Sequence, residues 1–147
     1  MFKQEKQVKK FLIEWYSLHA RILPWRKVNK HNLLNPYFVF VSEFMLQQTT
    51  VNTVNKKFKN FILKWPTLNN LAQANEPQIL KFWSGLGYYS RARNLLKSAK
   101  LIKNNFKNKI PQSYNDLIKL PGVGDYTANA ILGIAFNKPV MPIDANI

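Results

Sequence analysis

The 147 residues contain no cysteine, so they form no disulfide and offer no thiolate to a metal ion. Acidic residues are scarce: seven Asp and Glu stand against 22 Lys and Arg, a formal net charge of +15. No hydrophobic run approaches membrane-spanning length, and the first residues lack the apolar core of a signal peptide. We therefore expect a cytoplasmic protein with no membrane partner. The positive charge favours a polyanion such as nucleic acid as its partner.

The pattern of apolar residues predicts an all-α fold. With 46% hydrophobic and 14% aromatic residues, the chain can form one core and is not a disordered basic tail. Spacings of three and four residues predict an amphipathic helix near residues 4–20, stopped at Leu23-Pro24-Trp25, and a long helix over about 38–62 that allows a break. A polar loop separates them at 27–36. No strand pattern and no internal repeat is present.

Helix start and stop signals mark the second half of the chain. Asn75 is a good N-cap, Pro77 suits a first turn, and Gly85 and Gly87 stop that helix. An apolar stripe over 92–102 predicts the next helix. A further helix is expected from near Ser113, and another that carries Tyr126 is expected after it.

The segment Leu120-Pro121-Gly122-Val123-Gly124 predicts a hairpin between two helices, at residues 120–125. Two glycines around one aliphatic residue allow positive φ, and the backbone N–H groups then point outward at a helix start, where they can bind phosphate. We expect Gly122, Val123 and Gly124 to bind DNA without reading its sequence, because phosphate contacts position but do not specify. The alternative is an ordinary helix–helix turn.

Two acidic residues suggest chemistry on the nucleic acid. Asp144 follows the hairpin by twenty residues, and a carboxylate near a DNA backbone would weaken binding if binding were its only task. Glu43 is a lone acid in an apolar stretch; if buried, its pKa would rise and it could act as a general acid near neutral pH. The alternative is an exposed helix glutamate. Gln47 and Gln48 could face either solvent or the edges of bases.

Four motifs occur together and in order: V-S-E-F-M-L-Q-Q-T, W-S-G-L-G-Y-Y-S-R-A-R-N-L, L-P-G-V-G-D-Y-T-A-N-A-I and P-I-D-A-N-I. From about Leu23 to the last residue the chain resembles the adenine DNA glycosylases of the MutY type, within the helix-hairpin-helix DNA glycosylase superfamily. The resemblance implies that this all-α fold is incomplete at its C-terminus. Residues 1–147 would form a single helical domain, with the catalytic part at 23–147 and an N-terminal helix within 1–22 that would pack on the missing region.

The resemblance implies removal of adenine mispaired with 8-oxoguanine or guanine in double-stranded DNA, after the nucleotide is flipped out. It makes Glu43 the catalytic acid and Asp144 the carboxylate that stabilises an oxocarbenium-like sugar, with both acids beside one extruded nucleoside. Tyr126 would lie near the reacting sugar. Gln48 and Tyr88 would enter the base stack, although a solvated amide and a core aromatic are the alternatives, and Tyr89 is the better core candidate. Further DNA contacts are expected at Arg26, Thr49 and Leu86, and we expect a monomer.

The sequence also departs from this family. The family carries a 4Fe-4S cluster on four cysteines and usually a domain that recognises 8-oxoguanine, and neither is present in these 147 residues. Ala145 replaces the usual glycine, and the 27–35 loop is longer than typical. Because only three residues follow Asp144, we expect the chain alone to be an inefficient enzyme.

Two other functions stay open. An endonuclease III-like glycosylase/lyase would carry a lysine where this chain has Tyr126. A non-enzymatic helix-hairpin-helix DNA-binding module would make both acids incidental.

Overall fold

The structure is a computed structural model that describes residues 2–143, with side chains from residue 4 onward. Within that range it is helical and contains no β-strand, as expected for an all-α fold. The helices, in chain order, are α1 (Phe2–His19), η1 (Pro24–Arg26), α2 (Pro36–Leu46), α3 (Val51–Lys64), α4 (Leu68–Gln73), α5 (Glu76–Trp83), α6 (Ser90–Asn105), α7 (Tyr114–Leu117) and α8 (Asp125–Phe136). None of these helices is both long and apolar enough to cross a membrane.

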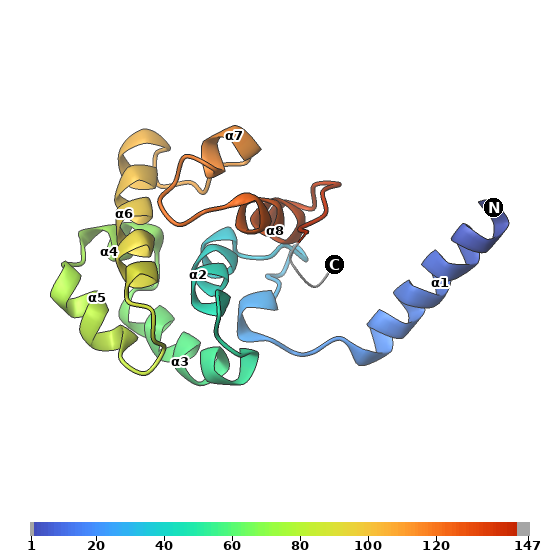
Figure 1. The fold of residues 1–147 in the computed structure, drawn as a ribbon, viewed down its shortest axis with the longest axis horizontal. Helices are drawn as coiled ribbons and strands as arrows, with labels where there is room; N and C mark the ends of the chain where they lie inside the picture. Colours follow the sequence, from blue (N-terminus) through green and yellow to red (C-terminus); the bar gives the residue numbers. More distant parts are fainter. Residues whose placement is uncertain (1, 144–147) are drawn as a thin grey trace.

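Helix α2 lies at the centre of the helical body, with α8 on one side of it and α3 and α6 on the other (Figure 1). It contacts η1, α3, α6 and α8, and all seven residues from Val39 to Met45 are buried. A helix that is apolar on every side has to be enclosed by its neighbours. Its only acidic residue, Glu43, is therefore carried into the core of the protein.

The helix predicted over 38–62 is two helices. Residues 47–50 separate α2 from α3, and Gln48 in this break has a positive φ of 52°. Thr50 then acts as the N-cap of α3, because its side chain accepts a hydrogen bond from the N–H of Thr53. The break turns the chain sharply at the end of α2, and it places Gln48 on the surface.

The capping signals after residue 74 are confirmed. The Asn75 side chain accepts from the N–H of Gln78, whose own side chain accepts from the N–H of Asn75, which completes a capping box. Gly85 and Gly87, with φ of 88° and 71°, form the turn between α5 and α6. The start of the helix predicted from residue 113 is also confirmed, with Ser113 as the N-cap of α7.

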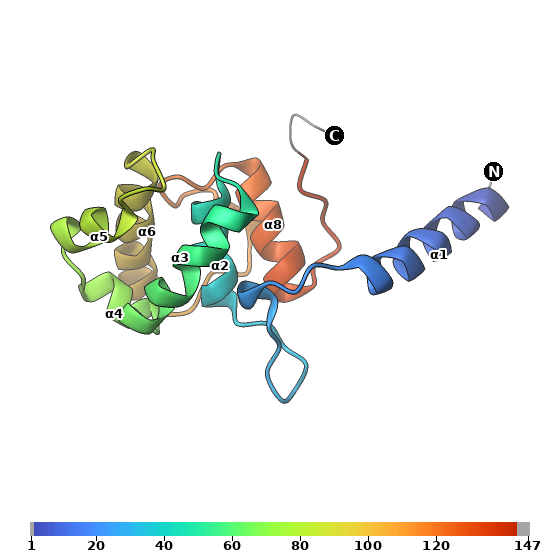
Figure 2. The same ribbon diagram turned by 90° about the horizontal axis from the view of Figure 1, so that it is seen from below.

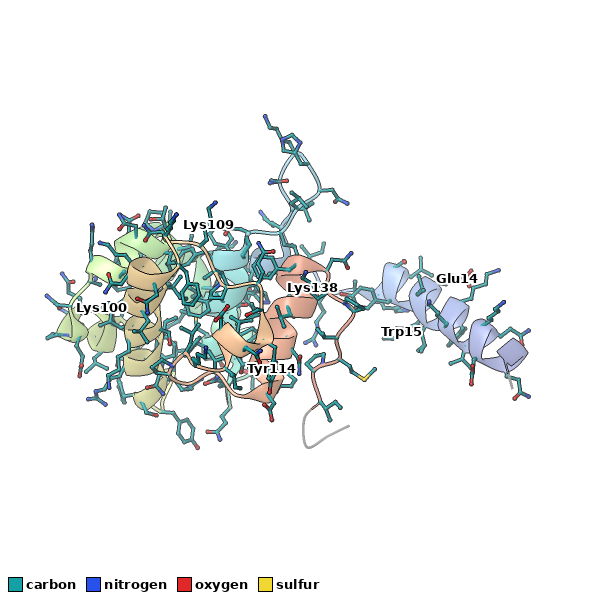
Figure 3. The ribbon with its side chains drawn as sticks, turned by 90° about the horizontal axis from the view of Figure 1, so that it is seen from above. Glu14, Trp15, Lys100, Lys109, Tyr114 and Lys138 are labelled. Atoms are coloured by element: carbon teal, nitrogen blue, oxygen red, sulfur yellow. The ribbon has the colours of Figure 1, made fainter. Side chains whose placement is uncertain are left out.

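Helix α1 extends away from the body (Figures 1 and 2). The apolar stripe predicted for residues 4–20 lies on this helix and is exposed, with Phe11 at 65% and Trp15 at 50% of their possible surface. Figure 3 shows Glu14 and Trp15 on this helix, well apart from Lys100, Lys109 and Lys138 on the body.

The loop at 27–36 is closed by one antiparallel bridge between Val28 and Leu34. Neither Tyr88 nor Tyr89 belongs to the core: Tyr88 is 64% exposed, and Tyr89, the better core candidate of the two from the sequence, is the less exposed at 43%. Both residues lie in the turn that leads into α6, on its outer side, where Trp83 already fills the core below.

Candidate functional site

Glu43 is buried in the middle of α2, with 7% of its surface exposed. Burial raises its pKa to about 7 from the ordinary value of 4.5, because the charged form loses water, and the positive charge of Arg26 on η1 partly opposes this rise. The sequence predicted this behaviour for a buried Glu43. At neutral pH the carboxyl group is divided between its protonated and ionised forms, which suits a group that must both give and take a proton.

The Glu43 carboxyl oxygens are not locked in an internal hydrogen bond. Within residues 4–143 no side chain or main-chain group is bonded to them, and the only fully buried side-chain nitrogen or oxygen without a partner is Nε of Arg91. A ligand that reached the carboxyl group would therefore find its oxygens without a hydrogen-bond partner among these residues, with the charge of Arg26 nearby.

The predicted hairpin joins α7 to α8 and packs on α2. Gly122 has a φ of 80°, and a Cβ there would lie 2.8 Å from Cβ of Asn94 and 2.9 Å from Cε1 of Phe44. Glycine is therefore required at this position both for conformation and for space. Because Gly122 has no side chain, the hairpin can lie directly against α2 at Phe44, the residue that follows Glu43.

Gly124 has a different role from Gly122, which is the hairpin glycine that adopts positive φ. The φ of Gly124 is −95°, and it serves as the N-cap of α8. A Cβ on Gly124 would meet no atom within 4 Å, which leaves open space in front of the helix start. Within residues 4–143 the N–H groups of Gly122 and Gly124 make no hydrogen bond, so the hairpin keeps donors that a phosphate could use.

Gln47 links α2 to this hairpin. Its Nε2 donates to the carbonyl oxygen of Gly122 at 3.0 Å and to Oγ1 of Thr127 at 3.3 Å. The sequence left open whether Gln47 faces solvent or the edges of bases. It does neither, because its amide nitrogen is hydrogen-bonded within the protein. Gln48 is the exposed member of the pair.

The other predicted site residues lie in α8, in the hairpin and in the two turns that flank α3 and α5. Tyr126 lies in the first turn of α8 and is 41% exposed, and Val123 is buried beneath the hairpin. Thr49 and Leu86 face each other across two turns, since Oγ1 of Thr49 donates to the Leu86 carbonyl oxygen at 3.5 Å. Leu86 itself packs in the core, whereas Tyr88 projects outward. Asp144 lies outside the described residues.

A pocket of about 1560 Å³ lies between the end of α1, the 27–36 loop and the end of α8. Among the predicted site residues that the structure describes, Arg26 alone lines it. Residues 2–143 hold no group of three His, Cys, Asp or Glu side chains that could bind a metal, and the chain has no cysteine for a 4Fe-4S cluster.

Arg91 was missed by sequence reasoning. It is 6% exposed and donates to oxygens of residues 44, 45, 47, 49, 86 and 87. A signal was present: Arg91 lies four residues before Leu95, on the apolar stripe of α6, whereas Arg93 is exposed and pairs with Glu76 at 2.7 Å. A charge on an apolar face predicts a buried, satisfied group.

The sequence of this chain matches a known protein family. Residues 41–147 match the HhH-GPD family, described as the HhH-GPD superfamily of base excision DNA repair proteins. This chain belongs to the HhH-GPD superfamily. The match covers the second half of α2 with Glu43, the turn before α6, and the hairpin.

Similar curated proteins of this superfamily are named adenine DNA glycosylase. The protein from Buchnera aphidicola subsp. Schizaphis graminum is 44% identical over 92% of this chain, and the one from Homo sapiens is 39% identical over the whole chain. The chain spans 38% and 28% of their respective lengths.

Solved structures agree on the HhH-GPD fold. A thermostable thymine-DNA glycosylase superposes with a TM-score of 0.86 at 27% identity, over 98% of this chain and 64% of that one. Endonuclease III in a non-covalent DNA complex superposes with a TM-score of 0.76 at 24% identity, over 95% and 64% of the two chains. The helix-hairpin-helix glycosylase fold expected from the motifs is therefore confirmed.

Proposed function

We propose that this chain is the catalytic part of an adenine DNA glycosylase, which hydrolyses the N-glycosidic bond of adenine mispaired with 8-oxoguanine or guanine. The observation that carries this proposal is Glu43, a buried acid with a pKa of about 7 and no hydrogen bond within the described residues, inside a base-excision repair fold. Relatives named adenine DNA glycosylase that align over 92% or more of the chain support the choice of adenine.

Glu43 would act in two steps. Its protonated form gives a proton to the adenine ring, so the base leaves as a neutral molecule with the electron pair of the broken C1′–N bond. The carboxylate that remains then accepts a proton from the water that attacks C1′. The products are free adenine and an abasic site, and Glu43 regains its proton.

Asp144 would stabilise the positive charge that develops on the sugar as the bond breaks, as paired carboxylates divide labour in glycoside hydrolysis. Tyr126 would lie beside the same sugar, and its exposed position in the first turn of α8 supports this. The convergence of Glu43 and Asp144 on one nucleoside remains a prediction.

Double-stranded DNA would bind along the hairpin and the two turns that flank α2 and α6. Amides of the hairpin, at Gly122, Val123 and Gly124, would hold phosphates. The N–H groups of Gly122 and Gly124, which make no hydrogen bond within residues 4–143, and the open space before α8 support this, whereas the N–H of Val123 donates to the carbonyl oxygen of Leu120 at 3.1 Å. Gln48 and Tyr88, both exposed, would enter the base stack. Arg26, Thr49 and Leu86 stay proposed contacts, and we propose that the protein acts as a monomer.

The family resemblance also implies a 4Fe-4S cluster, but no residue of this chain can supply a thiolate ligand to it. The steps above use protein side chains and water alone.

An endonuclease III-like glycosylase/lyase is the second candidate, favoured by the structural similarity to endonuclease III. Lyase chemistry needs an amine nucleophile near the sugar, and the first turn of α8 offers Tyr126 and no lysine. Borohydride trapping on damaged DNA separates the two: a covalent adduct would support the lyase, and its absence would support simple hydrolysis.

The proposed function is tested by single-turnover release of adenine from an A:8-oxoguanine duplex. The Glu43→Gln variant keeps the size of the side chain and removes the transferable proton, and we expect its rate to fall at least a hundredfold. Glu14→Gln on α1 makes the same change at an exposed site and should keep the wild-type rate. An unchanged rate in Glu43→Gln would reject Glu43 as the acid. If Asp144→Asn were also neutral, the non-enzymatic DNA-binding module would be the better description.

A further inference from the structure

The guanidinium group of Arg91 connects two separate segments of the chain. Nη1 donates to carbonyl oxygens at the end of α2, to Met45 at 2.9 Å, to Phe44 at 3.3 Å and to Gln47. Nη2 donates to Oγ1 of Thr49 at 2.9 Å and to the carbonyl oxygens of Leu86 at 2.8 Å and Gly87 at 3.1 Å. One planar group thus joins the break after α2 to the turn before α6.

These acceptors flank the two residues proposed to enter the DNA. Gln48 lies between Gln47 and Thr49, and both neighbours accept a hydrogen bond from Arg91. Tyr88 directly follows Gly87, whose carbonyl oxygen also accepts from Arg91. Gln48 and Tyr88 themselves make no hydrogen bond with the guanidinium group.

Both of these residues have an unusual backbone conformation. Gln48 has a φ of 52° and Tyr88 a φ of 46°, in the left-handed region that side chains other than glycine rarely adopt. Such conformations persist only where the surrounding structure imposes them, and they gather at functional sites. The hydrogen bonds on the neighbouring residues supply that constraint.

The charge of Arg91 is satisfied by these oxygens and not by an acid. Within residues 4–143 no carboxylate forms an ion pair with it, and three of its acceptors are carbonyl oxygens at the C-terminal end of α2, where the helix dipole favours a cation. The rings of Trp83 and Tyr88 lie 5.6 and 5.7 Å from its Cζ. A buried cation bound in this way costs desolvation, which an apolar residue would avoid, so its retention suggests a role in geometry.

We propose that Arg91 is a positioning residue that fixes Gln48 and Tyr88 in one relative arrangement, so that both side chains meet the DNA together. The proposal rests on the proposed function, since it assumes that these two side chains enter the base stack. Arg91 does not touch the reacting atoms. It would act by keeping the two turns from moving independently when the duplex is opened.

The test uses Arg91→Lys and Arg91→Met, with Arg93→Lys and Arg93→Met as matched controls. Arg93 lies two residues away on the same helix, but its side chain is exposed and, among residues 4–143, binds Glu76 alone. The lysine ammonium is a compact charge that cannot span both groups of acceptors as the planar guanidinium does. Thermal unfolding identifies any variant that fails to fold, and Arg91→Lys keeps the test available if Arg91→Met does.

The first measurement is amide hydrogen exchange in the free protein. In the Arg91 variants we expect exchange to accelerate about tenfold or more in residues 47–49 and in residues 86–88 together, with α3 and α4 unchanged. The Arg93 variants should match wild type. Faster exchange in only one of the two turns, or in neither, would overturn the proposal whatever the enzyme does.

The second measurement separates positioning from general stability. At saturating enzyme, single-turnover adenine release should fall on the order of a hundredfold in Arg91→Lys. Its affinity for undamaged duplex should stay within about threefold of wild type, because the hairpin amides are unaffected. Fluorescence of 2-aminopurine placed at the target position should show reduced base extrusion to a matching degree.

Wild-type rates of release and extrusion in Arg91→Lys, with both turns loosened, would overturn the proposal. Absence of adenine release by the wild-type protein would instead contradict the proposed function, and hydrogen exchange would still decide whether Arg91 joins the two turns.

Discussion

Replacing Glu43 by Gln should make the protein more stable at neutral pH, and the gain should depend on pH. Glutamine keeps the volume of the side chain and carries no charge to bury. Wild-type Glu43 has its pKa raised from 4.5 to about 7 in the folded protein, because burial disfavours the carboxylate. In the unfolded chain the group is ionised throughout that interval. Folding must therefore either bind a proton or bury a charge.

The magnitude follows from linkage. Between pH 4.5 and 7 the folded state binds one proton more than the unfolded state, so wild-type stability falls by about 1.4 kcal/mol for each pH unit. The stabilising contribution of protonated Glu43 is complete below pH 4.5 and lost above pH 7. Over this interval the shift of about 2.5 units corresponds to roughly 3 kcal/mol. The Gln variant has no such dependence at this position.

Urea unfolding at several pH values between 4 and 8.5 measures the difference. We expect the free energy of unfolding of the variant, relative to wild type, to increase by about 2–4 kcal/mol from the acidic to the alkaline end. Glu14→Gln, at an exposed site, provides the control and should show no comparable trend. A difference that stays constant with pH, or a variant that loses stability as pH rises, would refute the assigned burial and pKa of Glu43.

Three further results are expected. Gly122→Ala should lower the melting temperature by about 5–15 °C, because positive φ and overlap with Phe44 together cost roughly 2–4 kcal/mol. Gly124→Ala should change it by less than about 3 °C. Equal effects of the two substitutions in a thermal melt would contradict the different roles of the two glycines. Arg26→Met should move the pH interval in which wild type loses stability upward, because Arg26 lowers the pKa of Glu43; an unchanged midpoint in the same urea series would exclude this contact. Affinity for duplex DNA should fall about tenfold or more between low and physiological salt in fluorescence anisotropy, and a flat response would argue against phosphate binding.

Local signals in the sequence predicted much of the fold. The N-cap at Asn75 was predicted, because it depends on residues close in the chain, and the structure adds that Gln78 completes it as a capping box. For Glu43 the sequence predicted a raised pKa only if the residue were buried, with an exposed helix glutamate as the alternative, and the structure decides for burial. The hairpin motif indicated positive φ within the hairpin, which Gly122 adopts. The N-cap at Asn75 and the positive φ in the hairpin depend on neighbours within one or two helical turns, which a linear pattern contains. The crowding at Gly122 comes instead from Asn94 and Phe44, on other helices.

Features that depend on distant contacts were not predicted. Arg91 binds oxygens more than 40 residues away in the chain, so its acceptors could not be read from the pattern around it. The hairpin motif allowed positive φ at both glycines, and the pattern did not show that Gly122 alone adopts it while Gly124 serves as the N-cap of α8. The exposure of Tyr89 depends on how the turn before α6 packs over Trp83, and this packing cannot be predicted from the residues next to Tyr89 in the sequence.

The dependence of adenine release on pH tests the central claim most directly, namely that a buried Glu43 donates the proton. Under single-turnover conditions with an A:8-oxoguanine duplex, the rate should be high at acidic to neutral pH and should fall about tenfold per unit above roughly pH 7, as Glu43 loses its proton. A rate that stays constant from pH 6 to pH 9 in the wild-type protein would contradict the assignment of Glu43 as the general acid.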